Sequence, residues 1–424
     1  MFTRFLFKPH ESIKVILAIL LSVIIITSFS SCAIKNNSGQ NHLVYYTLND
    51  EDSLSWIIEK YNKYCINSNN PSFQVEIVKF DSEQEMSTQI STEIMAGSGP
   101  DIISLSQKLP FEKLIESRSL MNIYDLLKDD NSSNVINLDD YSVNILNAGV
   151  YDNGLYIVPL FYGVDVLVST EERLKNFDIK ENNGFSLTYS NFSDVFENYF
   201  LNDEGYSFVS NELSDFLWFD YPMQLFCRFL NSYVDFENKA VYFDTDEFKD
   251  NLDVMMQMLT ISQKNNTNEL FDGLYINRSF PLMAGSYSYY QSINETPVVF
   301  RGLTKNKDVN SAHIQVGYAI NNNTQLKEQA LAFIKYTLSD EIQEIGATAS
   351  GSLSFPVNIS VYDNAKLVAG SRTDDNNKII GIDNDFMKAY IDIADNVNAC
   401  TLYRDVSHSC LLYTSDAADD LLCV

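Results

Sequence analysis

The chain has 424 residues and a formal net charge of −28, with 57 acidic against 29 basic side chains. A surface of this sign repels phosphate backbones, so we expect no nucleic-acid partner. Hydrophobic residues make up 45% of the chain and charged residues 20%. This composition and length exclude a disordered chain and are typical of a globular protein with two or three domains.

Residues 1–31 have the pattern of an export signal. Their basic side chains come early, at Arg4, Lys8 and Lys14. An apolar run follows over residues 15–27, and small residues end the segment. The apolar run is shorter than the roughly 20 residues that a membrane-spanning helix needs, so the pattern favours cleavage over spanning.

The segment Phe29-Ser30-Ser31-Cys32 resembles a bacterial lipobox. The resemblance implies that Cys32 is lipidated, becomes the new N-terminus and anchors the protein to the outer face of the cell membrane. An ordinary signal peptide with an incidental cysteine is the alternative. Residues 32–40 are polar and rich in asparagine, as a flexible tether would be.

Strand and helix patterns alternate after the tether. The expected order is strand 42–48, a helix that opens at 49–52, strand 73–80, helix 82–96 and strand 101–105. This order predicts a doubly wound α/β sheet. Ligands of such sheets lie beyond the carboxyl ends of the strands, which makes Asp50 and Ser106 candidate ligand-binding residues.

The turn after the second helix is the most informative stretch. Gly97 suits the left-handed cap that ends a helix, and Pro100 prevents the helix from continuing. Farther along, Asp244 with Glu247 three residues on predicts the start of another helix. Its core face would comprise Phe248, Leu252, Met255, Met256 and Leu259.

Five segments resemble, in order, the extracellular solute-binding proteins of ABC importers, in the maltose-binding-protein-like carbohydrate branch. They are Glu93–Ile103, Gly154–Leu160, Val241–Phe248, Gln329–Tyr336 and Phe355–Asn358. The resemblance implies an α/β, type II periplasmic-binding-protein-like fold. Two lobes, each a mostly parallel sheet with flanking helices, would be joined by a multi-strand hinge with its first crossing near Leu160–Val164.

The hinge crossings predict lobes that are discontinuous in sequence. Lobe 1 would comprise residues 41–161 and 301–348, and lobe 2 residues 165–297 and 352–409. Residues 410–424 look like the translation of a sequencing adapter, so we expect them to be artefact and the second lobe to be truncated.

The motifs of common enzymes are absent from the sequence. It holds no H-E-x-x-H, C-x-x-C, G-x-S-x-G or Walker motif, and its four histidines are scattered. Apart from Cys32 and the suspected artefact, Cys65, Cys227 and Cys400 define no disulfide framework. We therefore expect no catalytic residues, no metal and no cofactor.

Aromatic residues, 13% of the chain, suggest the ligand class. Sugars stack their CH faces on aromatic rings, while their hydroxyls bind Asp, Asn and Ser side chains. Family resemblance places a stacking aromatic shortly after the glycine matched by Gly285, which makes Tyr287 the leading candidate. The full set of predicted ligand-binding residues is Tyr287, Tyr162, Trp218, Asp220, Asp50, Ser106 and Ser286.

The resemblance implies a monomeric substrate-binding lipoprotein that captures a neutral oligosaccharide and delivers it to an ABC permease in the membrane. Three alternatives remain open. The acidic chain would also suit a polyamine or another small solute bound by the same fold. An extracellular glycan-active enzyme would place a pair of carboxylates in the cleft. A surface lipoprotein that acts as a sensor would keep the fold without transport.

Overall fold

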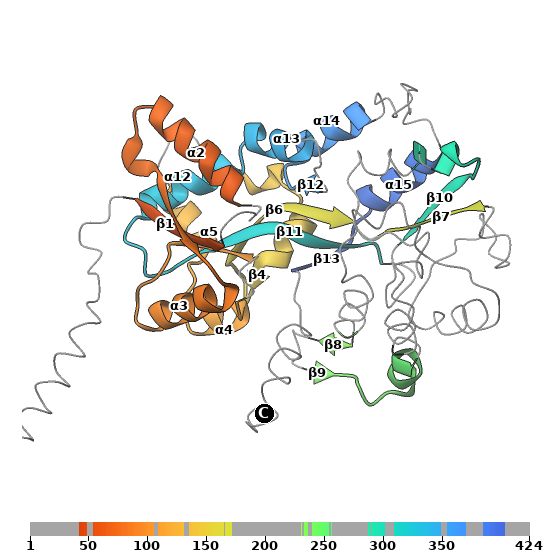
Figure 1. Ribbon diagram of the computed structural model, residues 1–424, viewed down its shortest axis with the longest axis horizontal. Coiled ribbons are helices and arrows are strands. Elements are labelled where there is room, and N and C mark those ends of the chain that lie inside the picture. Colours follow the sequence, from red (N-terminus) through yellow and green to blue (C-terminus); the bar gives the residue numbers. More distant parts are fainter. Residues whose placement is uncertain are drawn as a thin grey trace, which may run out of the picture. The chain divides into compact units, whose positions relative to one another are not determined.

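The protein is described here by a computed structural model (Figure 1). The described residues are 42–48, 54–105, 109–130, 135–164, 166–171, 230, 233–235, 240–253, 256, 287–288, 290–301, 309–348, 354–369 and 385–402. The predicted leader, tether and C-terminal artefact lie outside them.

A seven-stranded sheet organises the described residues (Figure 1). Its order is β12 (Phe355–Pro356), β6 (Ile157–Val164), β11 (Ser311–Ile320), β3 (Ile102–Ser104), β1 (Leu43–Leu48) and β2 (Val75–Phe80), with β13 (Ala399–Leu402) also paired to β11. β1 runs parallel to both β2 and β3. β11 is antiparallel to β3 and β6, and β13 is parallel to β11. The sheet is therefore mixed, whereas the resemblance implies a mostly parallel one, because β11 inserts antiparallel between β3 and β6.

The first three strands form the doubly wound unit that the sequence predicts. Helix α2 (Ser55–Asn67) connects β1 to β2, and α3 (Glu83–Met95) connects β2 to β3. Because β2 and β3 flank β1 on opposite sides, right-handed crossovers place α2 and α3 on opposite faces of the sheet. Both faces are thus covered, and Leu43 and Tyr45 of β1 are fully buried. The expected strand at 73–80 begins later, at Val75, because Pro71–Phe73 form a 3-10 turn.

The remaining helices and short elements surround this sheet. The helices are α4 (Phe111–Glu116), α5 (Ile123–Lys128), α6 (Val143–Leu146), α12 (Lys327–Thr337), α13 (Asp340–Thr348), α14 (Ile359–Ala369) and α15 (Asp385–Asp395), with 3-10 turns η1 (Pro71–Phe73), η3 (Leu138–Asp140) and η4 (Asn147–Gly149). Three short antiparallel pairs are β4 (Val150–Tyr151) with β5 (Gly154–Leu155), β7 (Val166–Thr170) with β10 (Pro297–Arg301), and β8 (Val234–Asp235) with β9 (Ala240–Val241).

The turn between α3 and β3 takes the predicted conformation. The Ser82 side chain accepts a hydrogen bond from the Glu85 N–H and caps the start of α3. Gly97, just after the helix, has a φ of 78°, in the left-handed region that glycine adopts at little cost. The polar side chain that fixes this turn comes from far along the chain: Asn321, directly after β11, donates from its amide to the carbonyls of Ser98 and Pro100.

The Asp101 carboxylate joins the same turn to β1. It accepts hydrogen bonds from the Val44 N–H, at 2.8 Å, and from the Thr324 side chain. Asp101 is 5% exposed, and burial raises the pKa of its carboxyl above the usual 3.8, although the two hydrogen bonds oppose the shift. The folded state therefore holds this proton more tightly than the unfolded state does.

We expect Asp101→Asn to remove a pH dependence from stability. Because the folded pKa is raised, the wild-type free energy of unfolding should fall relative to the variant as pH rises from about 3.8 through the folded pKa, and then level off. The change should be about 1.4 kcal/mol per unit of pKa difference. Urea unfolding of both proteins between about pH 3 and 7 measures it. A wild-type free energy of unfolding that instead rises relative to Asp101→Asn as pH increases would show that the folded pKa of Asp101 is lowered.

The predicted helix near residue 245 begins as expected but with a different cap. The Thr245 hydroxyl, rather than the Asp244 side chain, accepts the hydrogen bond from the Phe248 N–H. Glu247 accepts instead from the Tyr233 hydroxyl, at 2.9 Å, so it does not complete a capping box. Phe248 is buried against the rings of Tyr233 and Phe243, which confirms its core position. Met256, predicted on the same face, is 47% exposed, so that part of the prediction is wrong.

Candidate ligand-binding site

The carboxyl ends of β1 and β3 lie at one edge of the main sheet. Tyr45 pairs with Ile102 in parallel register, so the chain leaves both strands in the same direction. Thr47 and Ser104, near the ends of these strands, are 2% and 3% exposed. Asp50 and Ser106 follow these ends in sequence but lie outside the described residues. Their role in binding therefore stays a prediction.

Two chain crossings connect the main sheet with the β7–β10 pair. β6 ends at Val164 and β7 begins at Val166, yet β6 pairs with β11 and β12 whereas β7 pairs with β10. The return path runs from β10 to β11. Their places in the chain are those predicted for the first two hinge crossings. The sequence also predicts a third crossing over residues 351–357. β12 falls within this range and pairs with β6 through Phe355–Tyr162 and Pro356–Phe161.

Tyr162, a predicted ligand-binding residue, is a core residue of β6. Its side chain is 4% exposed, and its ring centroid lies 5.5 Å from that of Phe355 on β12. Burial, with a smaller contribution from the charge of Asp395, raises the pKa of its phenol above the usual value. The ring therefore packs the junction of two strands in this structure, and a direct ligand contact by Tyr162 stays a prediction.

Tyr287, the leading candidate, lies in a short helical stretch that ends shortly before β10. Its ring is partly buried, with its centroid 5.7 Å from that of Phe386, the second residue of α15. The same stretch contributes Tyr290, which is fully buried. Glu295, between this stretch and β10, accepts a hydrogen bond from the Thr170 hydroxyl of β7 at 3.0 Å. Tyr287 is thus a half-buried aromatic next to a crossing strand, on a support fixed by buried contacts.

The structure does not describe the remaining predicted residues. Trp218, Asp220 and Ser286 lie outside the described residues, as does Cys32. No sequence pattern indicates that Phe386 and Phe355 contact Tyr287 and Tyr162, because these partners are distant in the chain and their helix or strand patterns mark them only as core positions. A contact map inferred from co-varying positions is the signal that would have found them.

Within the described ranges, no group of three or more His, Cys, Asp and Glu side chains has the arrangement of a metal site. None of the helices in these ranges combines the length and apolarity that a bilayer crossing requires.

Comparison with known proteins gives the family. Residues 56–372 match the model of the bacterial extracellular solute-binding proteins. No curated protein sequence matches the chain at a significant level.

Solved structures share the fold at low sequence identity. MalE from the phytopathogen Xanthomonas citri, described as a sugar-binding protein, superposes with a TM-score of 0.55 at 11% identity, covering 89% of this chain and 92% of that one. A sugar transporter from Rhizobium etli in an open conformation gives 0.51 at 16% identity, covering 90% and 94%. A chitin oligosaccharide binding protein gives 0.51 at 13% identity, covering 86% and 89%.

These matches confirm the predicted α/β periplasmic-binding-protein-like fold. The family binds solutes rather than transforming them, in agreement with a sequence that holds no catalytic motif. The family model covers the turn between α3 and β3, both crossings and β12. The chain belongs to the bacterial extracellular solute-binding protein family.

Proposed function

We propose that the protein is the substrate-binding component of an ABC importer and that its ligand is a neutral oligosaccharide. The ligand would enter between two lobes and be enclosed by bending at the crossing strands. One lobe would be built on the main sheet, to which β12 and β13 of the predicted second lobe also pair, and the other would include the β7–β10 pair. The closed protein would then present it to a membrane permease. Lipidation at Cys32 would keep the protein, as a monomer, at the outer face of the cell membrane.

The observation that carries the ligand class is the half-buried ring of Tyr287 beside the β10 crossing. An aromatic ring with one side supported by Phe386 can offer its free surface to the CH face of a sugar. Solved proteins of the same fold that are described as binding sugars or oligosaccharides support this class. Trp218, Asp220, Asp50, Ser106 and Ser286 would add further stacking and hydrogen bonds to the hydroxyls.

We expect Tyr287→Ala to weaken oligosaccharide binding by at least about 1 kcal/mol, a loss of about fivefold or more in affinity, because it removes the stacking surface. Isothermal titration calorimetry of the folded variant measures the change. Tyr64→Ala is the matched control, since Tyr64 is a half-exposed tyrosine on α2, and its loss should leave the affinity unchanged. Equal affinity of the wild type and Tyr287→Ala would contradict the stacking role.

A polyamine is the second candidate ligand, on the strength of the net charge of −28. Such a ligand would be held by several carboxylates in the cleft, and its binding would weaken strongly as salt is raised. Binding of a neutral sugar would depend little on salt. Titrations at low and high ionic strength therefore distinguish the two ligand classes.

A further inference from the structure

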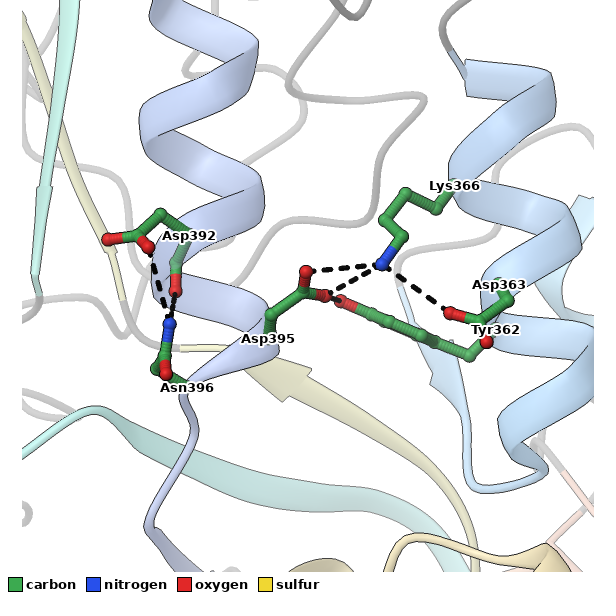
Figure 2. Close-up of polar contacts among 6 residues, drawn as sticks. All are labelled: Tyr362, Asp363, Lys366, Asp392, Asp395 and Asn396. Carbon is green, nitrogen blue, oxygen red and sulfur yellow. Dashed lines mark hydrogen bonds and ion pairs between the residues drawn. The ribbon is translucent and has the colours of Figure 1, made fainter.

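A polar cluster joins the C-terminal end of α15 to α14 (Figure 2). Asp395, the last residue of α15, accepts a hydrogen bond from the Tyr362 hydroxyl at 2.8 Å. Both oxygens of the same carboxylate lie 3.1 Å from the Lys366 ammonium. Lys366 also lies 3.4 Å from Asp363, but that residue is on α14 itself. Asp395 is therefore the group through which this cluster connects the two helices.

The cluster is partly sheltered from solvent. The side chains of Lys366 and Asp395 are 23% and 37% exposed, whereas that of Asp363 is 57% exposed. Burial by itself would lower the pKa of Lys366, but the hydrogen bonds and charges of Asp395 and Asp363 outweigh it and raise that pKa. Two charge-assisted hydrogen bonds plus one from a phenol hold the carboxylate more firmly than a fully exposed ion pair would.

The turn that follows α15 is also fixed. The Asn310 amide, just before β11, donates to the Asn396 carbonyl, and the Asn398 side chain accepts from the Asn310 N–H, both at 3.0 Å. The Asn144 amide of α6 donates to the Val397 carbonyl at the same distance. The segment before β11 and helix α6, together with α14, thus hold the C-terminal end of α15.

The apolar face of α15 reaches from this fixed end to the candidate site. Tyr390 is fully buried, with its ring centroid 6.1 Å from that of Phe355 on β12. Phe386, nine residues before Asp395, contacts Tyr287. At 1.5 Å of rise per residue, the helix spans about 14 Å between these two residues. A helix of this length is stiff, so fixing its far end also restricts Phe386.

We propose that Asp395 is a positioning residue for the candidate site: by holding α15 against Tyr362 and Lys366, it places Phe386 and so the ring of Tyr287. This proposal rests on the proposed function, because it requires Tyr287 to contact the ligand. Asp395 itself touches no ligand.

The experiment places 3-fluorotyrosine at residue 287 of the full chain and records its ¹⁹F signal without ligand. Asp395→Asn and Tyr362→Phe should each shift or broaden the signal. Asp363→Asn is the matched control, because it removes the same charge from beside Lys366 without breaking the link between helices. A second probe at Tyr64, on α2, should be unchanged in all variants.

Calorimetry then measures oligosaccharide affinity in the same variants. Asp395→Asn should raise Kd about fivefold when residue 287 is tyrosine and less than about twofold in a Tyr287→Ala background, because the two residues act through one contact. Asp363→Asn should change Kd less than about twofold.

The outcomes separate the two proposals. An unchanged ¹⁹F signal in folded Asp395→Asn and Tyr362→Phe overturns the positioning role, whether or not a sugar binds. A moved signal with unchanged Kd overturns it too, as do equal effects of Asp395→Asn in both backgrounds. If the two substitutions move the ¹⁹F signal but the wild-type protein binds no sugar, the proposed function is overturned, while the placement of Tyr287 by α15 stands.

Discussion

Replacing Phe333 with alanine is expected to lower the free energy of unfolding by about 3 to 5 kcal/mol. Phe333 lies on α12 and is fully buried. Its ring centroid is 5.2 Å from that of Tyr61 on α2 and 5.2 Å from that of Tyr318 on β11. The ring therefore joins two helices to the main sheet, and alanine would leave a cavity among the rings that now contact it.

Chemical unfolding followed by circular dichroism measures this loss. Phe333→Leu is the control, because it keeps most of the volume and should cost less than about 1.5 kcal/mol. If Phe333→Ala lowers the free energy of unfolding no more than Phe333→Leu does, the Phe333 ring does not pack against Tyr61 and Tyr318 as the structure shows.

Gly149→Ala is expected to destabilise the protein by about 3 kcal/mol, at the upper end of the usual cost of overpacking. Gly149 is buried at the end of η4, and a β-carbon at this residue would overlap the carbonyl oxygen of Ile157 on β6. A backbone oxygen in the sheet cannot move aside as a flexible side chain can. The Gly149 carbonyl also accepts the Tyr156 N–H at 3.0 Å, so a shift of the turn would strain this bond.

Gly97→Ala is the comparison that separates the cost of steric overlap at residue 149 from the cost of placing alanine at a positive φ. Gly97 has a positive φ, but a β-carbon added to it would meet no other atom within 4 Å. Alanine there should therefore cost only about 1 to 2 kcal/mol. Thermal unfolding of both variants supplies the comparison. A Gly149→Ala variant as stable as Gly97→Ala would refute the close approach of η4 to β6.

Local patterns are sufficient to predict the doubly wound unit. The β-prone apolar residues of β2, the helical spacing of Met86, Ile90 and Ile94 in α3, and the glycine after α3 each predict structure within a few residues. In these cases, the residues that determine an element are neighbours in sequence. The agreement between local preference and the final fold is what makes the structure of such a segment predictable.

Contacts between distant segments could not be predicted in the same way. Asn321 binds the turn between α3 and β3 across more than two hundred residues, and β11 inserts antiparallel between β6 and β3. The same limit applies to the candidate site. The position of Tyr162 at a predicted crossing suggests a ligand contact, but the strand that covers it, β12, is remote in sequence.

The most direct test of the account is a thermal-shift screen of the purified protein against neutral oligosaccharides, polyamines and short peptides. A ligand that binds the folded state raises the melting temperature in proportion to the logarithm of its concentration above Kd. We expect such a rise with at least one class of neutral oligosaccharide, and a smaller rise for Tyr287→Ala at the same concentration. A rise with polyamines alone, or no rise with any sugar for a cooperatively folding protein, would contradict it.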